Sequence, residues 1–143
     1  MTDKFNLNRF LEAQSSSYNI ALFEIKNGRK SSHWMWYIFP QIYGLGNSTT
    51  SKMYAIKSEE EARYYLNHPI LGKRLIEITE EILFIKNKTA IDILGSPDDL
   101  KLKSSMTLFH SIQAENKLFW SVLEKYFDGS QCNRTLSAIN QRN

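Results

Sequence analysis

A run of regularly spaced apolar residues constrains the fold of this chain more than any other feature. Its members recur at spacings of four, three, four and three residues, namely Leu71, Leu75, Ile78, Ile82 and Ile85. This spacing places them on one face of an α-helix, and the charged residues between them point away from that face. A helix with one apolar face must bury it against other elements, so the remaining segments decide the fold class.

Those remaining segments carry helix signals and no strand signals. Ser58 followed by Glu61 fits a capping box at the start of a helix. Ser96 fits the N-cap of a later helix with Pro97 in its first turn, and Pro69 fits the first position of the helix described above. No segment shows the alternation of a β-hairpin. Further helical stripes are Tyr18, Leu22 and Ile25; Leu102, Met106 and Phe109; and Phe119, Val122, Leu123 and Tyr126.

We therefore predict an all-α fold. It is a single compact domain over residues 1–143, a bundle of about six to eight short helices with an irregular glycine-containing loop. A chain of 143 residues is long enough to bury a core without disulfide bonds. The single cysteine, Cys132, excludes an internal disulfide framework and a cysteine-rich zinc site. No two histidines have the spacing of metal ligands, so we expect neither a metal ion nor a cofactor.

Charge and hydropathy narrow the range of partners. The net charge is +3, and basic residues are scattered apart from the cluster Lys26, Arg29 and Lys30. A nucleic-acid-binding protein usually gathers its charge into a stripe, so we expect no nucleic acid partner. The longest apolar run, Trp34 to Phe39, is too short to cross a bilayer, and the first residues lack the pattern of a signal peptide. We expect a cytoplasmic protein without membrane contact.

The segment KSSHWMWYIFPQ, residues 30–41, contains four aromatic residues and a histidine. Aromatic residues are usually buried, which favours a central packing element, but core rings also form the floor of ligand clefts. Trp34 and Trp36 are therefore candidates both for the core and for stacking on a ligand. His33, which follows Ser32, is a candidate acid, base or phosphate donor, and its structural alternative is a helix cap.

An irregular stretch, QIYGLGNSTT, follows at residues 41–50. Gly44 and Gly46 give its backbone conformational freedom, and loops held beside a rigid element often contact ligands. Gln41 and Tyr43 lie in the same stretch. We include these four residues among the candidate ligand contacts.

A second polar concentration is GSPDDLKLKSSMTLFHS, residues 95–111. On a helix starting near Pro97, the spacing aligns Asp98, Lys101 and Ser105, with Asp99 and Lys103 as a second pair. The structural interpretation is an exposed, capped helix with two modest ion pairs. The functional one is a polar stripe facing a cleft, in which lysine and serine hold an anion and a carboxylate acts as a base.

Three motifs, GRKSSHWMWYIFPQIYGLG, YAIKSEEEARYYLNHPILGKRL and GSPDDLKLKSSMTLF, together resemble the bacterial family called domain of unknown function 1810. The resemblance runs from about Phe5 to Leu136. It implies a compact, mainly helical domain, and it implies no activity. Tyr37 stands where such sequences often have phenylalanine. A more distant analogy, on general architecture alone, is with the NADAR family, which acts on ADP-ribosylated guanine.

Three functional hypotheses follow from these residues. The first is the binding of a phosphate-containing, nucleotide-like or ADP-ribose-like small molecule. The second is a hydrolase that cleaves a glycosidic bond of such a molecule, with His33, Asp98 and Asp99 as catalytic residues. The third is a protein-interaction or self-association module, including a homo-oligomer. The candidate ligand-binding residues are Ser32, Trp34, Trp36, Gln41, Tyr43, Gly44, Gly46, Lys101, Ser104 and Ser105.

Overall fold

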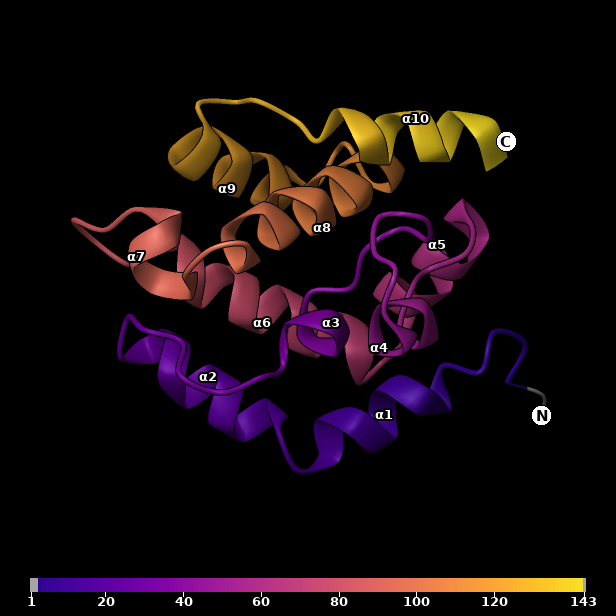
Figure 1. The fold of residues 1–143 in the computed structure, drawn as a ribbon, viewed down its shortest axis with the longest axis horizontal. Coiled ribbons are helices and arrows are strands. Elements are labelled where there is room, and N and C mark those ends of the chain that lie inside the picture. The colour runs from indigo at the N-terminus through magenta and orange to yellow at the C-terminus, as the bar shows by residue number, and fades with distance from the viewer. Residues whose placement is uncertain (1–2, 143) are drawn as a thin grey trace.

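Helices build the fold throughout residues 3–142, the part of the chain that the computed structural model describes, with side chains to residue 140 (Figure 1). Within this range the one β feature is an isolated parallel bridge between Ile42 and Ile56. The all-α prediction is confirmed. The ten helices described are α1 (Asn8–Ser15), α2 (Tyr18–Lys26), α3 (Met35–Ile38), α4 (Thr49–Met53), α5 (Glu59–Asn67), α6 (Leu71–Leu83), α7 (Ala90–Leu94), α8 (Asp98–Ile112), α9 (Lys117–Phe127) and α10 (Asn133–Arg142).

The helix count exceeds the six to eight predicted because α3, α4 and α7 have only four or five residues each. Such short helices complete little more than one turn and carry no detectable apolar period.

The centre of the molecule is formed by α6 and α8. α6 packs against α2, α5 and α9, and α8 packs against α5, α7, α9 and α10. In Figure 1, α1 and α2 lie along one side, α8 to α10 along the other, and α6 runs between them. Leu71, Leu75, Ile78 and Ile82 are buried as the spacing predicts, whereas Ile85 lies beyond the end of α6 and is partly buried.

The start of α5 agrees with the sequence, whereas Pro69 is not the first residue of α6, because the helix begins at Leu71 with Ile70 as its N-cap. The Ser58 hydroxyl accepts a hydrogen bond from the backbone N–H of Glu61, as in a capping box. The Glu61 carboxylate completes no box, because it accepts from the N–H of Lys57 instead. At the start of α6, His68 Nδ1 accepts from the N–H groups of Ile70 and Leu71. The imidazole of His68 therefore does the work of an N-cap.

The predicted N-cap at Ser96 is wrong. The Ser96–Pro97 peptide bond is cis, and the N-cap position of α8 is Pro97, which makes no side-chain cap. The first amides of α8 bond to carbonyls instead, for example Asp99 N–H to the Gly95 oxygen at 3.0 Å. Backbone geometry has replaced the side-chain cap at this helix end.

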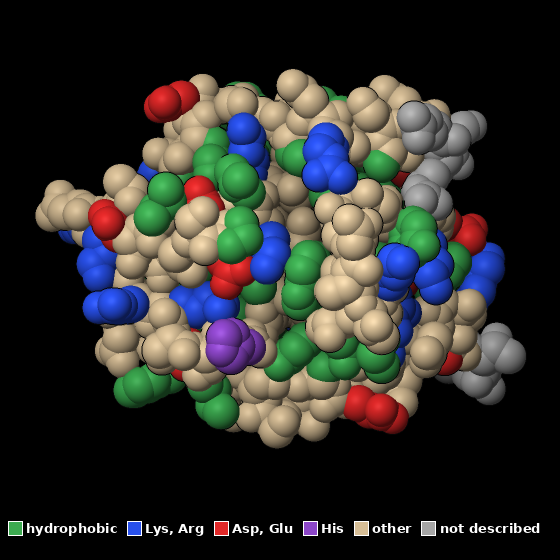
Figure 2. All heavy atoms as spheres, in the orientation of Figure 1, with side chains coloured by type: hydrophobic (Ala, Val, Ile, Leu, Met, Phe, Trp, Pro, Cys, Tyr) green, Lys and Arg blue, Asp and Glu red, His purple; other side chains and the backbone are tan. Residues whose placement is uncertain are grey.

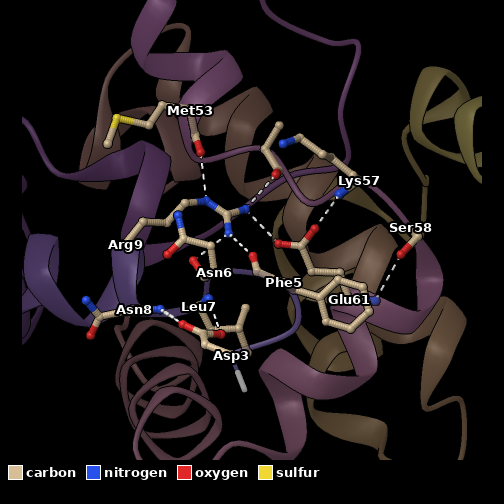
Figure 3. A network of polar contacts seen from close by, with 11 residues as sticks. Asp3, Phe5, Asn6, Leu7, Asn8, Arg9, Met53, Lys57, Ser58 and Glu61 are labelled. Carbon is tan, nitrogen blue, oxygen red and sulfur yellow. Dashed lines mark hydrogen bonds and ion pairs between the residues drawn. The ribbon is translucent and has the colours of Figure 1, made fainter. Parts of the chain in front are cut away.

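A buried ion pair fixes the N-terminal segment to the middle of the chain (Figure 3). One Nη of Arg9 lies 2.6 Å from a carboxylate oxygen of Glu61, and both side chains are buried. Every N–H of the guanidinium has an acceptor, so the charge is fully hydrogen-bonded. The other acceptors are the main-chain carbonyls of Phe5, Asn6, Met53 and Ala55. This network holds the end of α4 and the segment after it against α1.

Candidate functional site

The two polar motifs meet where α3 packs against α8. The Lys101 ammonium lies 4.3 Å from the centroid of the Trp36 ring, a cation–π contact. Trp36 belongs to α3 and is half-buried, and Lys101 belongs to the second turn of α8. Residues more than sixty positions apart in the chain are thus brought into direct contact.

Asp98 lies between two lysines beside this contact. Its carboxylate is 2.8 Å from the Lys30 Nζ and 2.9 Å from the Lys101 Nζ. Burial opposes ionisation of Asp98, but hydrogen bonds and attraction from Lys30 and Lys101 outweigh it and lower its pKa. The Lys30 side chain is only 8% exposed, and its ammonium also lies 5.2 Å from the centroid of Trp34. The three charged groups together carry a net charge of one positive unit.

A cavity of about 430 Å³ opens over this group, and we call it the His33 hollow. His33 and Asp98 line it together with Lys30, Trp36 and Lys101. His33 is exposed. In the space-filling view, an exposed histidine is visible with basic, acidic and hydrophobic side chains around it (Figure 2). The hollow therefore combines a titratable ring, an ion-paired carboxylate and an aromatic wall.

A second cavity of about 440 Å³ adjoins the first, and we call it the Cys132 groove. Trp36 and Lys101 line both cavities, so the two adjoin along these side chains. The rest of the groove comes from α8, from Gln41 and from the segment that leads into α10. Ligand pockets of drug-sized molecules have volumes of about 300–1,000 Å³, and each cavity lies in that range.

The thiol of Cys132 lies at the start of α10. The Leu136 N–H bonds to the Cys132 carbonyl, and the Ser104 hydroxyl lies 3.3 Å from the sulfur. Burial raises the pKa of the thiol, but hydrogen bonds from Ser104 and from the first turn of α10 outweigh burial and lower it. The half-buried sulfur is thus the N-cap of α10 as well as part of the groove wall.

The glycine loop, residues 41–50, packs closely against Trp36. A Cβ on Gly46 would come within 2.7 Å of Ser51 and 3.1 Å of the Trp36 ring, so only glycine lets the loop approach that ring. Gly44 and Tyr43 line a further shallow cavity that Arg134 shares. The Arg134 guanidinium donates to the carbonyls of Gly44 and Leu45 at 3.4 Å each. α10 and the loop are therefore joined at the rim of the groove.

The chain is similar to known proteins in both sequence and structure. A family model described as "Protein of unknown function (DUF1810)" matches residues 4–139. The chain belongs to the DUF1810 family. This DUF1810 chain is also similar to a crystal structure, "conserved hypothetical protein Rv1873 from Mycobacterium tuberculosis". The two share 43% of their residues over 96% of this chain and 99% of that one, with a TM-score of 0.95. No curated protein matches the chain significantly.

Two residues predicted to contact ligand are hydrogen-bonded to a buried acid of the DUF1810 domain: Trp34, which lies in the core, and Ser32, which is half-buried. Trp34 is 1% exposed, and its indole N–H donates to the Glu24 carboxylate at 2.9 Å. Ser32 donates its hydroxyl to the same carboxylate at 2.5 Å. Glu24 also accepts from the N–H groups of Ser31 and Ser32. Trp34 and Ser32 therefore build the turn that presents His33, and Trp34, though almost fully buried, also lines the His33 hollow.

Ser105 and Asp99 are also corrected. Ser105 is fully buried. It lies in the part of α8, from Ser104 to Phe109, in which every residue is buried. Asp99 is buried and lines neither cavity, and no ion pair joins it to Lys103 among the described side chains. A rotation of 100° per residue turns Asp99 away from the face that Asp98 shares with Lys101. Asp98 is thus the acid that reaches the candidate site.

The residues that contribute to the site without having been predicted as site residues include Glu24, Lys30, Cys132 and Arg134, and Lys103 was predicted only as a partner of Asp99. Glu24 had a signal, because it is an acid beside the apolar stripe of α2, where it faces the core. Cys132 and Arg134 had none, since only the packing of α10 on α8 brings them to the groove.

The largest of the described cavities, about 650 Å³, lies elsewhere, between residues 3–11 and the end of α5. Three of its polar side chains already have partners: Asp3 accepts from two N–H groups, Lys4 pairs with Glu60, and His68 caps α6. No group of three or more histidine, cysteine or acidic residues suited to a metal occurs in the described part of this DUF1810 chain. No helix there is long and apolar enough to span a membrane.

Proposed function

We propose that this protein binds a nucleotide-like or ADP-ribose-like small molecule against Trp36, between the His33 hollow and the Cys132 groove. The observation that carries the proposal is the contact between the half-buried Trp36 ring and the Lys101 ammonium, at 4.3 Å. An aromatic wall beside a cation is suited to a ligand that joins a flat ring to a phosphate.

The surroundings of Trp36 support this assignment. The loop glycine Gly46 packs against the ring on one side, and α8 packs on another, so its position is set by the fold. Pre-positioned aromatic groups lose little conformational freedom when a ligand stacks on them. Lys101 is held by Asp98, which fixes the ammonium next to the ring.

Hydrolysis of the same class of ligand is a second candidate. It is favoured by one observation, that His33 and Asp98 line one cavity. The lowered pKa of Asp98 argues against this role, since a carboxylate with a lowered pKa is a weaker base. Asp98 is better suited to orienting Lys30 and Lys101. We therefore place binding first and turnover second.

An interaction module is supported least. Of the aromatic segment, Trp34 and Phe39 are in the core, and Trp36 and Tyr37 are half-buried. An anchor patch for a protein partner would present such rings as a contiguous exposed surface. Our proposal also places the protein in the cytoplasm, where a half-buried thiol such as Cys132 stays reduced.

The test is a binding screen with a matched pair of variants. Adenosine, AMP, guanosine, GMP and ADP-ribose are added in turn, and the melting temperature is recorded. At least one of them should raise it in the native protein, and Trp36→Leu should abolish that increase. Tyr64→Leu is the control, because Tyr64 is an exposed ring near Phe5, outside both cavities. Binding is excluded if no compound raises the melting temperature. Mass spectrometry of the same mixtures detects turnover, and a cleaved product would put the hydrolase first.

A further inference from the structure

The Cys132 groove has an unbalanced charge. Its lining includes three cationic residues, Lys101, Lys103 and Arg134, and no aspartate or glutamate. Lys101 is paired with Asp98, whereas neither Lys103 nor Arg134 lies within ion-pair distance of a carboxylate in the described part of the chain. The groove is thus more positive than the His33 hollow, where Asp98 offsets part of the charge. An uncompensated pair of cations in a concave surface attracts an anionic ligand.

A buried donor in the same groove lacks a partner. Gln41 lines the groove and is 5% exposed, and its Nε2 makes no hydrogen bond within the described structure. A buried amide donor without a partner costs free energy, so such groups in native proteins usually meet a ligand or water. The backbone of Gln41 is fixed, because its carbonyl accepts from the Ile56 N–H at 2.8 Å. The Gln41 side chain therefore starts from a fixed backbone position and is buried in the wall of the groove.

We propose that the Cys132 groove is the subsite for the ligand's phosphate, with Gln41, Lys103 and Arg134 as its donors. This inference rests on the proposed function, since it assigns the two ends of one ligand. The ring lies against Trp36, and the phosphate lies beyond Lys101 in the groove. The ligand class is thereby narrowed to nucleotides, and an uncharged nucleoside fills only part of the site.

Calorimetric titration with nucleoside and nucleotide pairs tests this assignment. AMP should bind at least about tenfold more tightly than adenosine, since charge-assisted hydrogen bonds to the phosphate are added. Lys103→Gln and Arg134→Gln should each reduce the affinity for AMP by a larger factor than the affinity for adenosine. Arg63→Gln is the matched control, because Arg63 is exposed on α5 outside the groove.

Gln41→Met is a sharper variant, because it separates ligand binding from stability. Methionine keeps the volume and removes a donor that has no partner, so the ligand-free protein should keep or raise its melting temperature. AMP affinity should fall nevertheless. A lower melting temperature with unchanged AMP affinity would make Gln41 a structural residue and overturn its assignment as a phosphate donor.

The single thiol provides an independent readout. Cys132 is half-buried in the groove wall, and alkylation by N-ethylmaleimide adds one detectable mass to the chain. AMP and inorganic pyrophosphate should slow this alkylation, and adenosine should slow it much less.

The outcomes separate this inference from the proposed function. Equal affinities for AMP and adenosine would overturn the phosphate subsite and leave ring binding intact. Pyrophosphate could slow alkylation while Trp36→Leu leaves the affinities for nucleosides and nucleotides unchanged. In that case the phosphate subsite is supported and the proposed function fails. If no compound binds or protects, both fail.

Discussion

The indole N–H of Trp34 donates to the carboxylate of Glu24 at 2.9 Å, and the two residues are 1% and 7% exposed. The same carboxylate accepts from the backbone of Ser31 and Ser32 and from the Ser32 hydroxyl. One buried acid thus fixes the turn that leads into α3. The positions of His33 and Trp36, on either side of Trp34, depend on it.

Replacing that acid should destabilise the whole domain. Glu24→Gln keeps the shape but removes the negative charge, so the three N–H groups on Oε1 lose a charge-assisted hydrogen bond and the Ser32 hydroxyl must reverse to accept from the new amide. We expect the free energy of unfolding to fall by about 2–3 kcal/mol, measured by urea denaturation. Glu80→Gln, on the exposed side of α6, should change it by less than about 0.5 kcal/mol. Equal effects of the two variants would contradict the role of Glu24.

The same carboxylate predicts a pH dependence. Burial opposes ionisation of Glu24, but its hydrogen bonds, those from Ser32 first, outweigh burial and lower its pKa to about 2 from the usual 4.5. A lowered folded-state pKa stabilises the protein above the unfolded-state value, and this contribution is lost as the pH falls from about 4.5 to about 2. The difference in unfolding free energy between native protein and Glu24→Gln should therefore shrink over that interval. Urea denaturation between pH 3 and pH 7 measures it, and a constant difference would contradict the assignment.

The junction of α5 and α6 has no room for a side chain at Gly72. A Cβ there would lie 1.9 Å from the Leu66 carbonyl oxygen, which is backbone and cannot move aside as a side chain could. Gly72→Ala should thus lower the unfolding free energy by about 3 kcal/mol, although alanine favours helices by about 1 kcal/mol over glycine. Thermal denaturation measures this loss. An unchanged melting temperature would mean that the two helices can separate at no cost.

Removing Asp98 alone should lower the free energy of unfolding more than removing both Asp98 and Lys30. Asp98→Asn leaves the nearly buried Lys30 ammonium without its counter-ion, and we expect a loss of about 2–4 kcal/mol in urea denaturation. Adding Lys30→Met should restore much of it, because the unpaired charge is then gone. If the double variant is less stable than Asp98→Asn by the full cost of Lys30→Met alone, the two residues do not interact.

The sequence was sufficient to predict the helices that carry an apolar stripe. α6 could be recognised because Leu71, Leu75, Ile78 and Ile82 repeat over several turns. α3 could not be recognised, because four residues complete barely one turn and apolar side chains surround the helix on every side. The N-cap at Ser96 failed for a different reason: a carbonyl, that of Gly95, took the place of the expected hydroxyl.

The candidate site was predicted in part for similar reasons. The sequence shows that the two motifs contain many functional residue types, but how far Trp34 and Trp36 are exposed in the cavity that both of them line depends on tertiary packing. The Glu24 carboxylate draws Trp34 inward, and the lysine at position 101 meets the ring of Trp36. Cys132 and Arg134 come from a helix whose place beside α8 no local pattern encodes.

The Arg9 guanidinium has a consequence for the glycine loop far from it in the chain. Two of its bonds go to the carbonyls of Met53 and Ala55, main-chain atoms that every amino acid possesses. The anchoring atoms are therefore present whichever side chain stands at these two positions. The exposed Met53 can be replaced without loss of its anchor, whereas the buried Ala55 has less room for a larger side chain. The segment that follows the glycine loop is thus already ordered in the folded protein. A ligand that contacts the loop therefore binds without the entropy cost of ordering that segment.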